Sequence, residues 1–129
     1  MCGGVRFGIT GPLVSAGYCH CRRCQRRTGT GSSINGRLSA GALHLVAGEE
    51  LVRVYTPPDG APKAFCSVCG GHVWSQDRAD PAVKSVRLGA LDGDPGIRPQ
   101  YHQHTDSAAV WQPLPDDGLP RYGQARAQR

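Results

Sequence analysis

The six cysteines of this chain fall into three groups, and their spacing constrains the fold more than any other feature. Cys2 precedes two glycines, the central group has the pattern Cys-x-Cys-x-x-Cys, and the third has the pattern Cys-x-x-Cys-Gly-Gly. The central group consists of Cys19, Cys21 and Cys24, and the third of Cys66 and Cys69. Thiolates at such spacings suit a tetrahedral Zn²⁺ ion. Because metal binding is coupled to folding, these groups bear on both the fold and the chemistry of the chain.

A disulfide framework is the competing explanation for the cysteines. Six cysteines among 129 residues are fewer than a disulfide-rich scaffold carries. The N-terminal residues contain no apolar segment of the kind that forms a secretory leader, and no run approaches the roughly 18 apolar residues of a membrane span. We therefore expect a cytoplasmic protein that does not contact membranes. In that compartment thiols stay reduced, so the cysteine groups indicate metal or catalytic sites.

The composition and the apolar pattern predict short strands joined by turns. The chain contains 18 glycines and 10 prolines but only 6% aromatic residues, and residues 4–10 alternate apolar and polar side chains as a half-buried strand does. Extended segments are predicted at residues 13–18, 33–38, 43–46, 52–55, 64–66, 72–75, 84–91 and 99–104, with one helical turn within residues 21–28. This pattern indicates a mainly β fold with little helix. Core or pocket-wall positions are predicted for Phe7, Phe65, Trp74, Tyr101 and Trp111.

A chain of this length supports one domain with a modest core. Residues 1–112 are predicted to form that domain. Residues 113–129 lose the apolar periodicity and gain proline, aspartate, glycine and arginine, so we expect an extended or partly disordered C-terminal tail.

The third cysteine group has the form of a zinc knuckle. Two cysteines three positions apart face one ion when the chain turns tightly, and a following glycine permits the positive φ angle of such a turn. Cys66 and Cys69 therefore supply two ligands of one site, and Cys2 is a candidate for a third. The fourth ligand is not assigned by this pattern.

The central group has a different geometry. In an extended segment Cys19 and Cys21 point to one side and His20 to the other. If the chain turns after Cys21, Cys24 returns to the same side and three sulfurs hold one metal ion. The fourth coordination position is then open to water or a thiol, as in catalytic zinc sites.

A second partition of the cysteines is also compatible with their spacing. Cys21 and Cys24 would pair with Cys66 and Cys69 in a site built from two knuckles. Cys2 and Cys19 would then be left out of the site. The spacing alone leaves both partitions open.

The net charge of +5 comes mainly from arginine, which supplies thirteen of the fifteen basic side chains. Four of the arginines crowd the central cysteine group: Arg22, Arg23, Arg26 and Arg27. A basic cluster suits a small acidic ligand or nucleic acid, and a solvated charged face is the alternative for any one arginine. Nucleic-acid binding uses aromatic side chains for stacking, and Tyr18 alone is aromatic here, so nucleic acid is disfavoured as a partner.

Taken in order, these motifs resemble the glutathione-dependent formaldehyde-activating enzyme family. That family is also called S-(hydroxymethyl)glutathione synthase and includes centromere protein V. The resemblance rests on Cys-Gly-x-Val-Arg-Phe near the start and on residues 18–29, 65–71, 86–92 and 97–99, and it spans roughly residues 2–112. It implies a β-tent of several small coiled antiparallel sheets stapled by zinc, with one structural and one catalytic site.

The resemblance also implies a role for each cysteine. Cys2, Cys66 and Cys69 match three of the four ligands of the structural zinc. The first cysteine of the family's N-terminal pair falls one position before Met1, so either translation starts upstream or this site has three sulfurs; we favour the upstream start. The ligands of the catalytic zinc are matched by the central group, Cys19, Cys21 and Cys24.

The activity that the resemblance implies is a carbon–sulfur lyase reaction combining glutathione, a small thiol, with formaldehyde, a small aldehyde. One or more of the arginines Arg22, Arg23, Arg26 and Arg27 would bind the glutathione carboxylates. Candidate proton donors are His20, His72, His102 and His104, although a lone histidine in a strand is more often structural. The alternative is a non-catalytic zinc module that binds protein or nucleic acid.

Overall fold

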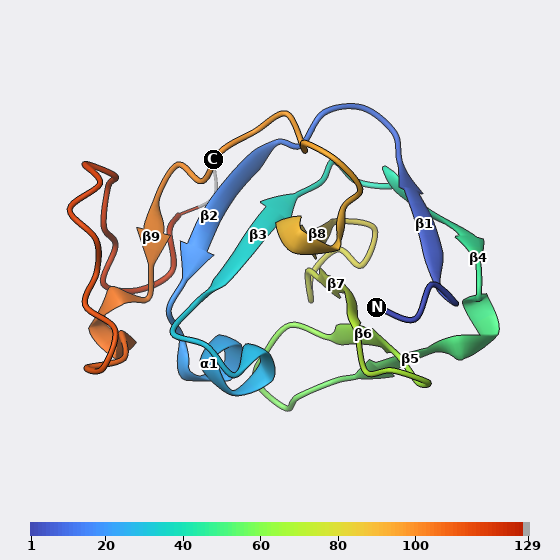
Figure 1. The fold of residues 1–129 in the computed structure, drawn as a ribbon, viewed down its shortest axis with the longest axis horizontal. Helices are drawn as coiled ribbons and strands as arrows, with labels where there is room; N and C mark the ends of the chain where they lie inside the picture. Colours follow the sequence, from blue (N-terminus) through green and yellow to red (C-terminus); the bar gives the residue numbers. More distant parts are fainter. Residues whose placement is uncertain (128–129) are drawn as a thin grey trace. The chain divides into compact units, whose positions relative to one another are not determined.

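The computed structural model describes residues 1–127 and is built mainly from short β-strands (Figure 1). The strands are β1 (Arg6–Ile9), β2 (Ser15–Cys19), β3 (Ser33–Arg37), β4 (Leu43–Ala47), β5 (Val52–Tyr55), β6 (Lys63–Cys66), β7 (His72–Gln76), β8 (Lys84–Arg87) and β9 (His102–Gln103). The helical elements are α1 (Arg22–Thr28) and the short 3₁₀ turns η1 (Glu49–Leu51), η2 (Leu88–Ala90) and η3 (Thr105–Ser107). The prediction of a mainly β fold with little helix is confirmed.

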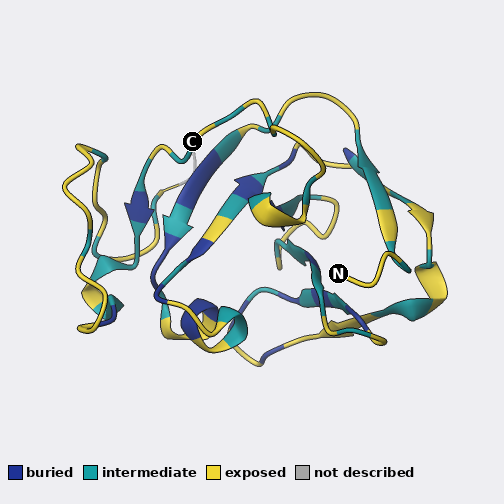
Figure 2. Cartoon of the chain, in the orientation of Figure 1, coloured by how far each residue is buried: buried dark blue, intermediate teal, exposed yellow. Residues whose placement is uncertain are grey.

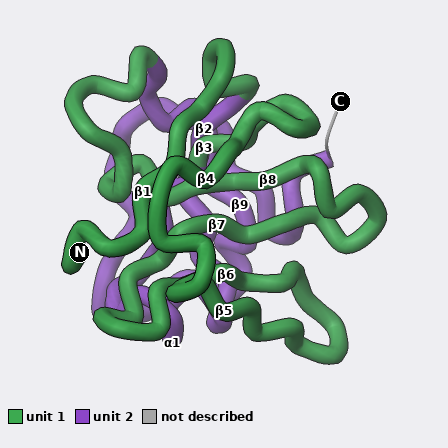
Figure 3. The backbone as a smooth tube through the Cα atoms, turned by 90° about the vertical axis from the view of Figure 1, so that its right-hand side faces the viewer, with its two compact units in different colours: residues 1–14, 36–96 green, residues 15–35, 97–129 purple. Residues whose placement is uncertain are grey.

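The chain divides into two compact units, coloured separately in Figure 3. Unit 1 comprises residues 1–14 and 36–96, and unit 2 comprises residues 15–35 and 97–129. Each unit contains three of the six cysteines. The predicted division into a 1–112 domain and a tail stays a prediction.

Unit 1 contains two sets of antiparallel strands. β1 pairs with β4, and β5, β6, β7 and β8 pair in chain order. Leu38, Ala42 and Val86 form a buried cluster in this unit. Partly buried side chains pack against that cluster: Phe7, Ile9, Leu13, Leu43, Trp74 and Leu91. Because this apolar core is small, metal binding can add substantially to the folding free energy of the unit.

In unit 2, β2 pairs in parallel with β9, which places Tyr18 opposite His102 and Cys19 opposite Gln103. Most residues of β2 are buried (Figure 2). The chain beyond residue 112 returns to β9, because the His102 N–H donates to Pro120 (2.8 Å) and the Tyr122 N–H donates to His102 (2.8 Å). The C-terminal segment is therefore joined to β9 by backbone hydrogen bonds.

Four expectations about local structure are corrected. The predicted strand at 84–91 ends at Arg87, since Leu88–Ala90 form a 3₁₀ turn closed by the Leu91 N–H on Leu88 (3.2 Å). The predicted strand at 99–104 is shortened to His102–Gln103, because Pro99 has no N–H to donate and His104 leaves the extended conformation with a φ of 56°. The single helical turn is instead a seven-residue helix, α1. Trp111 is not a core residue, because it is 65% exposed.

Among residues 1–127, no helix combines the length and the apolar character that crossing a membrane requires.

Candidate metal centres

The structure groups the six sulfurs into two triads, and each triad lies within one unit. Cys2, Cys66 and Cys69 form the first, called here the Cys2 triad. The second, the central triad, consists of Cys19, Cys21 and Cys24. Within each triad the sulfur atoms lie within 4.8 Å of one another. This grouping corresponds to the first partition considered above, and none of the six cysteines, which all lie among the described residues, forms a disulfide.

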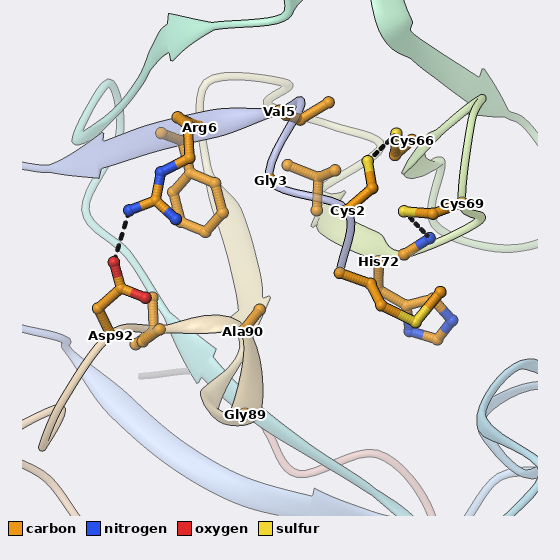
Figure 4. Close-up of a pocket in the computed structure, with 15 residues that line it drawn as sticks. Cys2, Gly3, Val5, Arg6, Cys66, Cys69, His72, Gly89, Ala90 and Asp92 are labelled. Carbon is orange, nitrogen blue, oxygen red and sulfur yellow. Dashed lines mark hydrogen bonds and ion pairs between the residues drawn. The ribbon is translucent and has the colours of Figure 1, made fainter.

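The sulfur spacing of the Cys2 triad fits a tetrahedral zinc ion. Cys2 Sγ and Cys66 Sγ are 3.8 Å apart (Figure 4). Zn–S bonds of about 2.3 Å in a tetrahedron place two sulfurs about 3.8 Å apart. A disulfide would bring them to about 2.05 Å. The three soft donors can therefore hold zinc with little movement.

The connection between β6 and β7 positions two of these sulfurs. Cys66 ends β6, and the chain then turns so that the Gly70 N–H donates to Cys66 (2.8 Å) and the Cys66 N–H donates to Gly71 (2.9 Å). Gly70 has a φ of 72°, a left-handed conformation that glycine adopts without strain. The Gly71 N–H approaches Cys69 Sγ at 3.4 Å. The turn has the form expected of a zinc knuckle.

Backbone amides shift the acidity of this triad. The pKa of the Cys69 thiol is lowered to about 6, first by the Gly71 N–H and then by the backbone of Cys2. At Cys2 the Gly4 N–H lowers the pKa, but the hydrogen bonds with the Cys69 and Cys66 sulfurs outweigh it and the net pKa is raised. Of Cys2 and Cys69, Cys69 is therefore the thiol that ionises more readily.

This difference predicts the reactivity of the metal-free protein. After chelation, Cys69 should react with iodoacetamide along a pH profile with a midpoint near 6, because its thiolate predominates above the lowered pKa of about 6. Cys19 should react only at higher pH, since hydrogen bonds from Cys21 and Cys24 and burial raise its pKa. Alkylation rates measured by peptide mass spectrometry between pH 5 and pH 9 test this. Equal profiles for the two cysteines would contradict it.

A cavity of about 300 Å³ lies beside the Cys2 triad. The three cysteines line one side of it, and Arg6 and Asp92 lie at the other (Figure 4). These two side chains form an exposed ion pair at 2.6 Å, which contributes little to stability. The cavity gives small chelators a route to the Cys2 triad.

The central triad is built where β2 ends and α1 begins. Cys19 is the last residue of β2, Cys21 caps the N-terminus of α1, and Cys24 lies in the first turn of that helix. Cys21 Sγ accepts the Cys24 N–H at 3.3 Å, so the chain turns after Cys21 as the spacing predicts. Cys19 and Cys24 are each 6% exposed. Three soft sulfurs in this arrangement also fit zinc.

The predicted arginines follow the central triad on α1. Arg22, Arg23 and Arg26 are exposed and Arg27 is half-buried. The first turn of the helix carries no acidic residue. The surface of α1 beside the triad is therefore basic, and its assignment to substrate binding stays a prediction.

The four candidate histidines have different surroundings. His20 and His102 are buried and hydrogen-bonded to each other at 2.8 Å. Burial, and next the His102 charge, lower the pKa of His20. His72 lies in unit 1 and accepts from Arg87 Nε at 3.4 Å, and His104 has a φ of 56°. Within unit 2, His20 is the candidate adjacent in sequence to the central triad.

Asp117 is a site neighbour that sequence reasoning missed. Its carboxylate accepts from His102 Nε2 at 2.9 Å, and this hydrogen bond lowers the pKa of Asp117. Residues 113–129 show no apolar periodicity, so no pattern in the sequence connects Asp117 with His102, fifteen positions earlier.

Comparisons with known proteins support the resemblance drawn from the motifs. The profile of the family described as glutathione-dependent formaldehyde-activating enzyme matches residues 1–107. The crystal structure of a Rhodobacter sphaeroides protein matches with a TM-score of 0.60 and 24% sequence identity, covering 94% of each chain. At this identity the likeness shows the fold alone. No protein with curated annotation matches the chain significantly.

Proposed function

The chain belongs to the glutathione-dependent formaldehyde-activating enzyme family, and we propose that it is a zinc-dependent enzyme of the carbon–sulfur lyase type that combines glutathione with formaldehyde into S-(hydroxymethyl)glutathione. The observation that carries the proposal is the central triad, whose three sulfurs lie within 4.8 Å of one another beside a basic helix. In the proposed reaction the glutathione sulfur bonds to the formaldehyde carbon. The π electrons of the carbonyl pass to its oxygen, which takes up the proton that the thiol loses.

Cys19, Cys21 and Cys24 would hold the metal ion in this proposal. Zinc, when bound by these residues, would supply a Lewis acid that lowers the pKa of a thiol substrate. Because the three cysteine thiolates donate much charge, they favour activation of a thiol over activation of water. The donor set is therefore suited to a thiol substrate.

The arginines of α1 would orient that thiol. Glutathione carries two carboxylates, and guanidinium groups bind carboxylates through paired N–H donors. Arg22 and Arg26 are exposed on the helix that carries Cys24. Their charge would draw the peptide to the surface beside the triad.

The Cys2 triad would serve the fold in this proposal. It joins the N-terminal segment to the β6–β7 turn within unit 1. A metal ion held there would cross-link segments distant in sequence, and its binding free energy would add to the folding free energy.

Exchange spectroscopy by NMR tests the activity. We expect zinc-loaded protein to accelerate the exchange between free glutathione and S-(hydroxymethyl)glutathione in the presence of formaldehyde. With 2-mercaptoethanol, which lacks the carboxylates, the acceleration should be at least about tenfold smaller, since binding to the arginines contributes about 1.4 kcal/mol or more.

An exchange rate equal to the rate without protein would overturn the enzyme proposal. A salt-sensitive shift of labelled RNA or DNA under the same conditions would then favour the non-catalytic zinc module.

A further inference from the structure

We propose that Asp117, acting through His102 and His20, is a positioning residue for the central triad. The inference rests on the proposed metal centre and concerns how its ligands are held. In this inference the C-terminal segment, residues 113–127, holds in place a site that is formed by residues 19–24 of the same unit.

The three side chains form a continuous hydrogen-bonded chain. Asp117 Oδ2 lies 2.9 Å from His102 Nε2, and His102 Nδ1 lies 2.8 Å from His20 Nε2. The two histidines are 1% and 7% exposed. The Tyr18 ring stacks on the His102 ring with centroids 4.6 Å apart and planes 10° apart. This packing leaves the His102 ring little freedom to turn.

The Asp117 carboxylate determines which ring nitrogen of His102 carries the proton that it accepts. An ionised carboxylate only accepts, so His102 donates to it from Nε2. The other ring nitrogen of His102, Nδ1, then faces His20 Nε2 at 2.8 Å. Hydrogen bonds behind metal ligands commonly fix the orientation of those ligands.

His20 lies between two ligands of the triad, and all its polar groups are held. Its N–H donates to Gln103 at 3.0 Å, and its carbonyl accepts from Gln25 Nε2 at 2.7 Å. Its ring contacts His102 and the backbone of Gly31. Because His20 is fixed, the directions in which Cys19 and Cys21 leave the backbone are fixed as well. The sulfurs are therefore placed before a metal ion arrives.

The C-terminal segment holds Asp117 in turn. The Leu119 N–H donates to Asp117 Oδ1 at 3.1 Å, and the backbone of His102 bonds to Pro120 and Tyr122 on either side. One carboxylate oxygen of Asp117 thus accepts a hydrogen bond within its own turn, and the other accepts one from His102. Loss of the carboxylate releases the buried ring without removing a cysteine.

The experiment measures how zinc protects individual cysteines in the full chain. Zinc-loaded protein is titrated with a chelator and alkylated, and mass spectrometry follows two peptides, one with Cys19 and Cys21 and one with Cys66 and Cys69. In Asp117→Ala the central peptide should lose protection at about 10- to 100-fold lower chelator concentration. The peptide from the Cys2 triad should keep its wild-type profile.

Two variants make the outcome specific. Asp117→Asn keeps an oxygen that accepts from His102 and should recover part of the protection. Asp116→Ala removes an equal charge from the adjacent, exposed position and should match the wild type. Equal loss at both peptides in Asp117→Ala, or no loss at either, would overturn the inference.

The readout uses neither glutathione nor formaldehyde. If zinc protects the wild-type central cysteines but the protein shows no exchange activity, the proposed reaction fails and the positioning role stands. If zinc gives the wild-type central cysteines no protection, both the metal centre and the inference are overturned.

Discussion

In Cys24→Ser, the acceleration of glutathione–formaldehyde exchange is expected to disappear while the protein stays folded. Cys24 supplies one of the three sulfurs of the central triad and is 6% exposed at the start of α1. A serine hydroxyl is similar in size but stays protonated at neutral pH, and it replaces a thiolate poorly as a zinc ligand. Loss of a residue that only hydrogen-bonds to a metal ligand already costs about 10- to 100-fold in metal affinity or activity, so loss of a direct ligand should exceed about 100-fold.

Exchange rates by NMR and zinc content by elemental analysis measure this result together. The zinc content of Cys24→Ser should fall by about one ion per chain relative to the wild type, with the circular dichroism spectrum unchanged. If the variant keeps most of the wild-type acceleration, the central triad is not the catalytic centre.

The sequence predicts the central triad and the knuckle because their geometry is local, whereas Cys2 lies 64 positions before Cys66 and joins the knuckle only through the resemblance to the family. Cys19 ends β2 and Cys21 is still extended, so alternation places both on one side, and the short spacing to Cys24 needs only one turn of chain. The knuckle at Cys66 and Cys69 likewise follows from two cysteines and a glycine that permits positive φ. Patterns of a few residues determine such features, so reading them requires no knowledge of the tertiary structure.

The contacts around the central triad could not be predicted in this way. The hydrogen bond between His102 and Asp117 joins residues fifteen positions apart in sequence, and nothing in the composition of residues 113–129 indicates it. The same holds for Trp111, which is apolar and yet 65% exposed. Such outcomes depend on where the segment packs after folding, and no period in the sequence encodes this.

Cys66→Ser is expected to destabilise the protein strongly, in contrast to the same substitution at Cys24. Cys66 is 3% exposed, lies 3.8 Å from Cys2 Sγ and closes the knuckle through its own backbone N–H and carbonyl. Structural zinc contributes to folding directly, so loss of a ligand should lower the free energy of unfolding by about 3–5 kcal/mol. For a chain of this size the midpoint of thermal unfolding should fall by about 10 °C or more.

Thermal unfolding followed by circular dichroism, with and without a chelator, measures the effect. The chelator reaches the Cys2 triad through the adjoining cavity of about 300 Å³, so it should lower the midpoint of the wild type toward that of Cys66→Ser. It should lower the midpoint of the variant much less, because the metal-dependent stabilisation of unit 1 is already lost. Cys24→Ser is the matched control, being the same substitution at a buried cysteine of the other triad, and it should respond to the chelator as the wild type does. If the two serine variants unfold at the same temperature, the Cys2 triad is not the site through which metal stabilises the fold.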